Sequence, residues 1–242
     1  MYIKVYENNG RAETCAELLS RADLPSYIKG VELLPIPTRL YSPSFGDGGL
    51  FGLLDADCEG VVYAGYDIPP DFAMRVLEGG GILFDASLDE VFLQENAYLT
   101  SLGALGYILH SLCDTLEPRV GVVGYGRIGS HLSKMLLSLG VRVRVFTGRK
   151  ATRLELGEMG VESSEYGEGA DFTDLDLLVN TAPARTVVPP ADLPVFDLAS
   201  GDNFGGDMVR KLPALPAKLY PASAGKVWAE AIVRWFRRGG VE

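Results

Sequence analysis

Three glycines spaced as G-x-G-x-x-G constrain the fold of this chain more than any other feature. Gly124, Gly126 and Gly129 follow the apolar, β-branched run Val120–Val123, which is typical of a buried parallel strand. A helical pattern with one apolar face comes next, and an alternating run over residues 141–146 supplies the following strand. Strand, glycine turn, helix and second strand together predict the first βαβ unit of a Rossmann fold.

In such a unit the glycine turn lets the backbone approach a pyrophosphate, and the helix N-terminus offers N–H groups and a positive dipole end. The spacing also arises by chance in a chain with 29 Gly among 242 residues, so a tight turn that binds nothing is the alternative. The candidate dinucleotide-binding residues of this turn and the helix that it opens are Gly124, Gly126, Arg127, Ile128 and Gly129.

The end of the second strand indicates which dinucleotide binds. NAD enzymes usually place Asp or Glu there to hold the ribose 2′-hydroxyl, but this chain has Thr147, Gly148, Arg149 and Lys150. The two cations and the threonine hydroxyl suit a 2′-phosphate, which a carboxylate would repel. We therefore expect NADP rather than NAD, with Thr147, Arg149 and Lys150 as binding residues. The alternative is that both cations are solvated loop charges.

Two further loops follow predicted strands, where ligands of open α/β sheets bind. Residues 180–183 follow a strand at Leu177–Val179, and residues 197–206 follow one at Val195–Leu198. Asn180 and Thr181 could hydrogen-bond the nicotinamide ribose, or form a helix-capping turn. Asp197 could cap neighbouring backbone N–H groups. The candidate cofactor-binding residues of these two loops are Asn180, Thr181, Ala182, Pro183, Leu198, Ala199 and Ser200.

The charge of −10 is unevenly distributed and excludes some partners. Residues 1–117 carry 6 basic and 18 acidic side chains, whereas residues 118–242 carry 16 and 14. An acidic first half argues against nucleic acid or an anionic membrane surface as partner, and the second half suits an anionic cofactor.

No apolar run reaches the length of a membrane span, and the three cysteines lack metal-type spacing, so we expect a cytoplasmic protein without a metal.

The charge break near Pro118 also suggests a domain boundary. We predict an α/β fold with a doubly wound Rossmann sheet in residues 118–223 and a smaller α/β domain in residues 1–95. Residues 96–117 would form a connecting helix, and residues 224–242 a C-terminal helix. The remaining predicted strands are Ile3–Tyr6, Val31–Pro35, Val61–Ala64, Ile82–Asp85 and Lys218–Tyr220.

No catalytic residue can be identified from the sequence. The two histidines, His110 and His131, fall in predicted helices, away from the loops at strand ends. No Lys/Asp couple or Ser-His-Asp order stands out. The acid–base residue therefore stays unknown.

Several segments together resemble one family, the A subunit of dipicolinate synthase, over roughly residues 96–235. The family has an Asn-Thr-x-Pro segment, an Asp-Leu-Ala-Ser segment and an Ala-Gly pair before its last helix, besides the glycine turn. The corresponding segments here are Asn96 with Thr100–Ala104, Gly124–Gly129, Asn180–Pro183, Asp197–Ser200 with Gly205–Asp207, and Leu215–Gly225.

The resemblance implies NADP-dependent oxidation of a small-molecule substrate, a dihydrodipicolinate-like cyclic precursor, to dipicolinate during sporulation. It also implies a partner, a flavoprotein-like B subunit. Assembly of the chain into a homo-oligomer is a further alternative, which the sequence does not decide. Since a dicarboxylate needs a cation, Arg39 is the substrate-binding candidate, with a solvated surface arginine as the alternative.

The chain also departs from this family. Leu102 and Ala222 stand where the family has Glu and Lys, and the first domain is shorter than the family's. These departures favour two alternatives to the oxidoreductase. One is a non-catalytic, sporulation-associated binding protein that retains the Rossmann fold, and the other is a different small-acid dehydrogenase.

Overall fold

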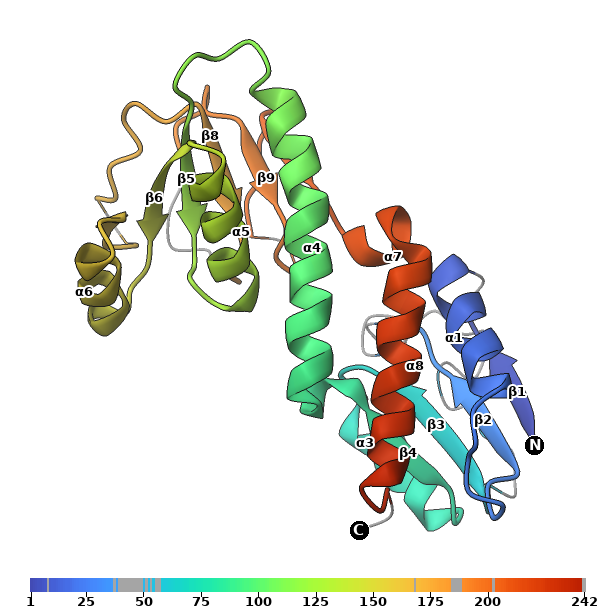
Figure 1. Cartoon of the computed structure of the whole chain (residues 1–242). Coiled ribbons are helices and arrows are strands. Elements are labelled where there is room, and N and C mark those ends of the chain that lie inside the picture. The colour runs from blue at the N-terminus through green and yellow to red at the C-terminus, as the bar shows by residue number, and fades with distance from the viewer. Residues whose placement is uncertain are drawn as a thin grey trace. The chain divides into compact units, whose positions relative to one another are not determined.

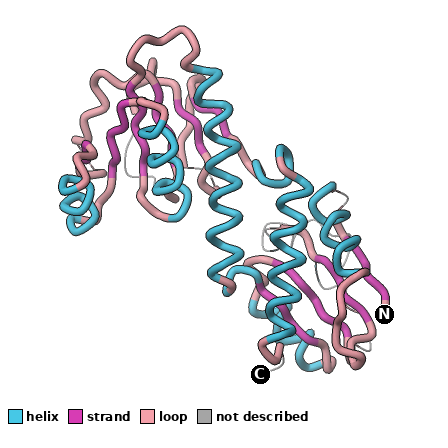
Figure 2. Tube along the Cα trace, viewed as in Figure 1, coloured by secondary structure: helices cyan, strands magenta, loops and turns pink. Residues whose placement is uncertain are grey.

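The chain forms two compact units in the computed structural model, each built on one parallel sheet (Figure 1 and Figure 2). Unit 1 comprises residues 1–96 and 216–242, and unit 2 comprises residues 97–215. Helix α4 (Glu90–Ser111) begins in unit 1 and continues into unit 2. The structure describes residues 1–7, 9–36, 38, 50, 52, 54, 58–167, 169–183, 189–201 and 203–240.

Unit 1 contains a four-stranded sheet whose strands follow one another in chain order. All neighbouring pairs are parallel. The middle strands β2 and β3 are buried along their whole length, as expected for strands covered on both faces. The strands are β1 (Tyr2–Val5), β2 (Gly30–Leu33), β3 (Val61–Gly65) and β4 (Ile82–Asp85).

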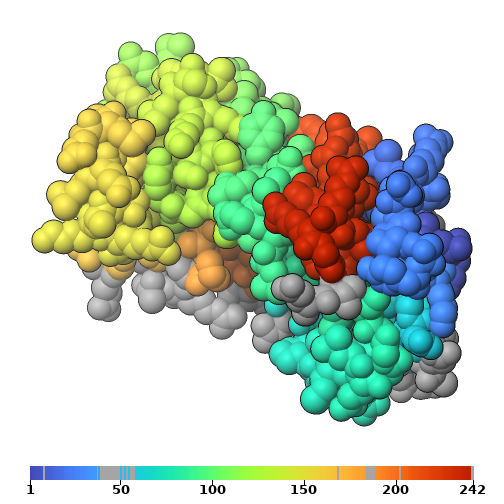
Figure 3. All heavy atoms as spheres, turned by 60° about the horizontal axis from the view of Figure 1, so that its bottom comes forward, coloured from blue at the N-terminus to red at the C-terminus, as the bar shows by residue number. Residues whose placement is uncertain are grey.

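Helices cover both faces of this sheet. On one face α1 (Gly10–Ser20) and α8 (Pro221–Arg237) pack against each other, and they lie side by side in Figure 3. Their approach is close because a Cβ on Gly225 would lie 2.5 Å from the carbonyl oxygen of Arg11. On the other face, α3 (Pro70–Glu78) packs Phe72 against the ring of Tyr63. The C-terminal helix thus completes the core of unit 1.

Unit 2 has the strand order of a Rossmann domain, β10-β9-β8-β5-β6-β7, with every neighbouring pair parallel. The predicted fold class is confirmed. The sheet places the ends of β5, β6 and β8 next to one another. Its strands are β5 (Arg119–Val123), β6 (Arg142–Phe146), β7 (Glu162–Ser164), β8 (Leu177–Asn180), β9 (Val195–Asp197) and β10 (Val209–Lys211).

The two faces of the second sheet are covered differently. Helices α4, α5 (Arg127–Ser138) and α6 (Lys150–Glu158) contribute to one core with the apolar side chains of β5, β6 and β8. On the other face, the described residues that pack against Phe146 and Leu178 come from loops: Phe172, Leu193 and Phe204. The helices that cover this sheet therefore lie on one face in the described part of the chain.

Two predicted elements, the connecting helix and the strand at residues 218–220, differ from the structure. The connecting helix starts at Glu90 rather than 96 because Asp89 caps it, accepting from the Phe92 N–H at 2.7 Å, and it ends at Ser111. Residues 218–220 are not a strand: residues 218 and 219 are the end of a short helix, α7 (Leu215–Leu219), which the buried Leu215 anchors, and residue 220 follows it. The 3-10 turn η3 (Ala86–Leu88) precedes the Asp89 cap.

The C-terminal helix also differs from its predicted bounds. It starts at Pro221, a residue favoured in the first helical turn, instead of Ala224. Residues 216–223, which the prediction assigned to the Rossmann domain, lie in unit 1, as does the whole of α8. The helix packs on α1, so it is part of the first α/β unit.

Asp89 links two helices of unit 1. Its carboxylate accepts from Arg234 of α8 at 3.0 and 3.3 Å, besides capping α4. Burial alone would raise the pKa of Asp89. Hydrogen bonds from Arg234 and from the Phe92 N–H, together with the charges of Arg234 and Arg238, hold that pKa below its usual value.

Asp89→Asn should lower the free energy of unfolding at neutral pH by about 1.5–3 kcal/mol, because it removes a charge-assisted hydrogen bond and weakens a helix cap. The folded-state pKa is depressed, so this stabilisation is complete above the unfolded-state value of about 3.9 and is lost as pH falls through the folded value. Urea unfolding over a pH series should show the two proteins converging in acid. Asp114→Asn, at an exposed position, is the control and should leave the free energy of unfolding unchanged at every pH. If the difference in free energy of unfolding between the wild type and Asp89→Asn did not depend on pH, the prediction would be wrong.

Candidate dinucleotide-binding site

The glycine turn after β5 gives each of its three glycines a different environment. Gly124 has a φ of +88°, a conformation that favours glycine. A Cβ on Gly129 would lie 2.2 Å from the carbonyl oxygen of Gly124, so close helix–strand packing excludes a side chain there. Gly126 is exposed and caps α5, and a Cβ on it would meet nothing within 4 Å. The space over Gly126 is therefore open.

That open space lies at the N-terminus of α5, which has no side-chain cap. Arg127 is exposed and Ile128 half-buried in its first turn. N–H groups and a helix dipole at such an end favour an anion. Burial and, as the smaller cause, the Glu155 carboxylate raise the pKa of Tyr125, which lies within the turn. The turn thus has the shape and polarity that a pyrophosphate needs.

Thr181 ties the end of β8 to the glycine turn. Its hydroxyl donates to the carbonyl of Val123 at 2.8 Å, and its backbone N–H donates to the same oxygen at 2.9 Å. A Cβ on Gly124 would lie 2.9 Å from the Cβ of Ala182. The structure therefore brings residues 180–182 against the turn, as the prediction of a shared strand-end site requires. Pro183 is exposed beside them.

Asn180 and Asp197 form a buried pair between the ends of β8 and β9. The Asn180 amide donates to Asp197 Oδ1 at 2.8 Å, and its own oxygen accepts from the Ala182 N–H at 3.2 Å. Asp197 also accepts from the Ala199 N–H and from Asn203. Both side chains thus shape the two loops. The pairing was not predicted, although the capping role of Asp197 was one alternative.

The remaining predicted residues of the β9 loop are less deeply placed. Leu198 is half-buried and packs at the border of the helical face of the sheet. Ala199 is half-buried, and Ser200 is exposed with its carbonyl accepting from Asn203 at 3.3 Å. These three residues follow β9 directly, and β9 is a parallel neighbour of β8, so they lie beside the carboxyl end of β8 as well. Cofactor contact for these residues stays a prediction.

The loop after β6 presents two exposed cations. Arg149 caps α6 and Lys150 opens it, while Thr147 is buried and its hydroxyl accepts from the Arg149 N–H at 3.3 Å. Arg153 donates to the Thr147 carbonyl at 2.7 Å and pairs with Glu165 at 3.4 Å. Arg153 was missed, although it lies in α6 only four residues after the N-cap Arg149.

The predicted substrate residue, Arg39, lies outside the described residues. Unit 1 does hold one buried cation in the described part, Arg11. It donates to the Ile36 carbonyl at 3.3 Å and pairs with Glu7 at 3.5 Å, so it joins α1 to the end of β2.

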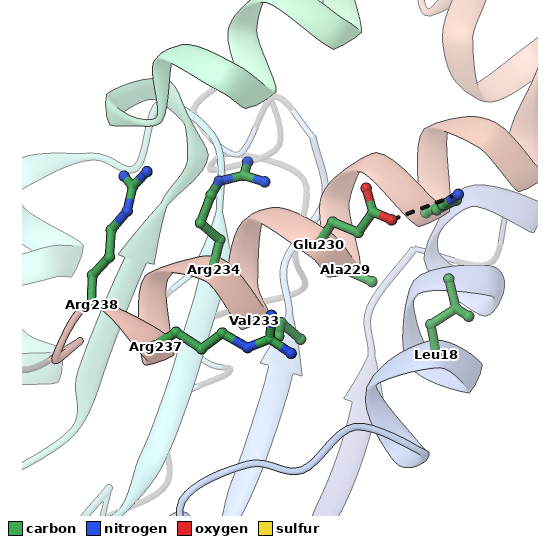
Figure 4. A pocket seen from close by; sticks show the side chains of 8 residues that line it. Leu18, Ala229, Glu230, Val233, Arg234, Arg237 and Arg238 are labelled. Carbon is green, nitrogen blue, oxygen red and sulfur yellow. Dashed lines mark ion pairs between the residues drawn. The ribbon is translucent and has the colours of Figure 1, made fainter.

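Unit 1 also has a hollow of about 600 Å³ between α1 and α8, which is lined by arginines such as Arg237 (Figure 4).

Neither histidine lies in the strand-end loops. His110 is exposed in the last turn of α4, and His131 on α5 stands edge-on to Tyr98, with ring centroids 5.8 Å apart. Among the described residues, no cluster of His, Cys, Asp and Glu could hold a metal ion, and no helix is both long and apolar enough to cross a bilayer.

Solved structures of similar fold exist, although no family model and no curated protein sequence matches the chain. The dipicolinate synthase A subunit from Bacillus halodurans matches with a TM-score of 0.73 at 20% identity, over 97% of each chain. The A chain from Bacillus subtilis matches with 0.74 at 18%, over 98% of this chain and 96% of that one. An L-alanine dehydrogenase matches with 0.60 at 13%, over 99% and 91%.

These comparisons establish the fold of the whole chain. The resemblance in sequence rests on residues 96–235, whereas the structural match to the dipicolinate synthase A subunit takes in nearly all of the chain, including the first sheet. The fold is thus shared with the A subunit of dipicolinate synthase and, more distantly, with a dehydrogenase.

Proposed function

We propose that this chain is an NADP-dependent oxidoreductase similar to the A subunit of dipicolinate synthase, which oxidises a dihydrodipicolinate-like cyclic precursor to dipicolinate. The observation that carries the proposal is the open space over Gly126 at an uncapped helix N-terminus, in a chain that matches the dipicolinate synthase A subunit over nearly its whole length. Bound NADP would supply the hydride acceptor for this oxidation.

The residues of unit 2 would bind and orient this cofactor. The turn at Gly124–Gly129 would hold the pyrophosphate, and Arg149 with Lys150 would neutralise the 2′-phosphate. The buried Asn180–Asp197 pair would fix the two loops that border the nicotinamide end, because both of its members are hydrogen-bonded within the protein. Such preorganisation limits the cost of binding. The dicarboxylate would require a cation, for which Arg39 stays our candidate.

The proposal is tested by incubating the purified chain with NADP and the dihydrodipicolinate-like precursor, with and without a flavoprotein-like partner protein. We expect NADPH absorbance to rise in step with dipicolinate formation. Gly126→Val, if folded, should give neither product and serves as the matched control. Absence of both products with the wild-type chain and its partner would overturn the assignment.

A different small-acid dehydrogenase is the second candidate, and the match to L-alanine dehydrogenase favours it. A panel of 2-hydroxy and amino acids, followed by NADPH absorbance, distinguishes the two reactions.

The third candidate is a non-catalytic binding protein. It is motivated by half-buried Leu102 and exposed Ala222, which replace the Glu and Lys expected from the resemblance. Tight NADP binding without turnover of any substrate would favour this third candidate.

A further inference from the structure

One arginine, Arg153, holds the turn from β6 into α6. Its Nη1 donates to the Thr147 carbonyl at 2.7 Å, and this bond closes a span of six residues across the turn. Its Nη2 pairs at 3.4 Å with Glu165, which follows β7. The Arg153 side chain is 20% exposed and that of Glu165 is 73% exposed. A single, largely buried guanidinium thus connects α6 with the ends of two neighbouring strands.

Thr147 is the residue that this guanidinium fixes. It is buried, its N–H donates to the Ser164 carbonyl at 3.1 Å, and its hydroxyl accepts from the Arg149 N–H at 3.3 Å. With the bond from Arg153 to its carbonyl, the N–H, the carbonyl and the hydroxyl of Thr147 are all hydrogen-bonded. Through its hydroxyl, Thr147 therefore holds the backbone of Arg149.

The first turn of α6 closes the same set of contacts. The Arg149 carbonyl accepts from the Arg153 N–H at 3.2 Å, and the Arg153 carbonyl accepts from the Ser163 hydroxyl at 3.4 Å. Arg149 is thus bonded to Thr147 on one side and to Arg153, which holds Thr147, on the other. The bond from the guanidinium is the charge-assisted one of this set, and such bonds are about twice as strong as neutral ones. Its loss should loosen the backbone that carries Arg149 and Lys150.

Arg153 also affects the charge at the strand ends. The 2′-phosphate of NADP would lie at the end of β6, and Glu165 stands one residue beyond the register that pairs Phe146 of β6 with Ser164 of β7. An exposed carboxylate there would repel the phosphate unless a cation balanced it. Arg153 is that cation, because it pairs with Glu165.

We propose that Arg153 is a positioning residue for NADP specificity, which fixes the backbone of Arg149 and Lys150 and balances the charge of Glu165. Its Nη1 and Nη2 are both engaged within the protein, so Arg149 and Lys150 would contact the 2′-phosphate and Arg153 would support them. The inference rests on the proposed function, since it concerns how the same cofactor is selected.

Arg144 offers a matched control on the same two strands. It also donates to backbone carbonyls, those of Asp171 and Thr173 at 3.3 and 3.4 Å, and it also pairs with a glutamate of β7, Glu162. Its side chain is 15% exposed, close to the value for Arg153. Because Arg144 lies within β6, two residues before the strand ends, its loss should lower stability without loosening the turn at Thr147.

Amide hydrogen exchange of the cofactor-free chain tests the structural step. Arg153→Ala should speed exchange of the Thr147 and Arg149 N–H groups by about tenfold or more, because loss of a charge-assisted hydrogen bond makes local opening easier. Arg144→Ala should leave both N–H groups at the wild-type rate. Unchanged exchange at both groups in Arg153→Ala would overturn the proposal.

Calorimetric titration with both dinucleotides tests the effect on specificity. Arg153→Ala should weaken NADP binding by about ten- to a hundredfold, and binding of NAD, which lacks the 2′-phosphate, by less than about threefold. Arg144→Ala should keep the wild-type ratio of the two affinities. If the wild type prefers NADP and Arg153→Ala keeps that preference, this inference alone fails. A wild type without a preference for NADP would contradict the proposed cofactor itself.

Two further variants separate charge from positioning. Arg153→Lys keeps a positive charge near Glu165 but loses the planar fork that reaches Thr147 and Glu165 together. Glu165→Gln, added to Arg153→Ala, removes the unbalanced carboxylate. Each should recover only about threefold in NADP affinity, because the carboxylate is exposed and screened, and neither should slow exchange at Arg149. Full recovery of NADP affinity by the double variant would show that charge alone matters, and would overturn the positioning role.

Discussion

Valine in place of Gly126 should abolish dinucleotide binding while leaving the free energy of unfolding almost unchanged. The backbone at Gly126 has φ −85° and ψ −161°, which valine adopts readily, and the added Cβ would meet no protein atom within 4 Å. The side chain would instead fill the space in which the pyrophosphate would approach the backbone. We expect at least about a hundredfold loss of affinity, or about 2.7 kcal/mol.

Two other glycines separate this effect from general damage. Gly129→Ala should lower the free energy of unfolding by about 2–4 kcal/mol, because its Cβ would lie 2.2 Å from the Gly124 carbonyl oxygen. Gly157→Val, on an exposed face of α6 without a neighbour, should alter neither stability nor affinity. Calorimetric titration with NADP and urea unfolding measure both quantities. Unchanged affinity in Gly126→Val would remove the basis of the proposed site.

The Rossmann core could be predicted because independent local signals agree there. The β5 strand is an apolar run, the glycine turn follows it directly, and the α5 pattern has one apolar face. In contrast, β7 and β10 have polar sequences, Glu-Ser-Ser and Val-Arg-Lys, that carry no strand pattern. They are strands because β6 and β9 offer them open edges to pair with. Tertiary context, not propensity, determines them.

The position of the last helix could not be predicted for a similar reason. The apolar stripe of α8 shows that one face is buried, but not which sheet it faces. That choice depends on contacts distant in sequence, such as Gly225 against the Arg11 carbonyl. The misassigned strand at residues 218–220 followed from treating this segment as part of the second sheet.

The candidate site shows the same division. The place of Gly126 in the turn could be predicted from the glycine spacing together with the strand and helix on either side of it, whereas the Asn180–Asp197 pair requires knowing that β8 and β9 are neighbours. Arg153 was overlooked because its contact, the Thr147 carbonyl, lies six residues earlier, across the turn from β6 into α6. Motifs thus predict the backbone of the site, and the sheet order determines which side chains support it.

NADP should bind more tightly than NAD, and Arg149→Ala should reduce the difference by about ten- to a hundredfold. Arg149 and Lys150 are exposed at the end of β6, where the 2′-phosphate of NADP would add negative charge. A charge-assisted hydrogen bond contributes roughly 1.5–3 kcal/mol, which corresponds to that range of affinity. Solvent exposure screens the interaction, so raising the salt concentration should move the ratio toward the lower value.

A control variant distinguishes direct contact between Arg149 and the 2′-phosphate from a general effect of removing an arginine near β6. Glu165 is paired with Arg153 at 3.4 Å, so its charge is already balanced by a cation other than Arg149 and Lys150. Arg142→Ala is the matched control, because this exposed arginine lies at the opposite end of β6 and pairs with Glu117. It should leave the ratio of NADP to NAD affinity unchanged. Calorimetric titration of both cofactors decides the matter: equal affinities, or tighter NAD binding by the wild type, would mean that Arg149 and Lys150 point into solvent.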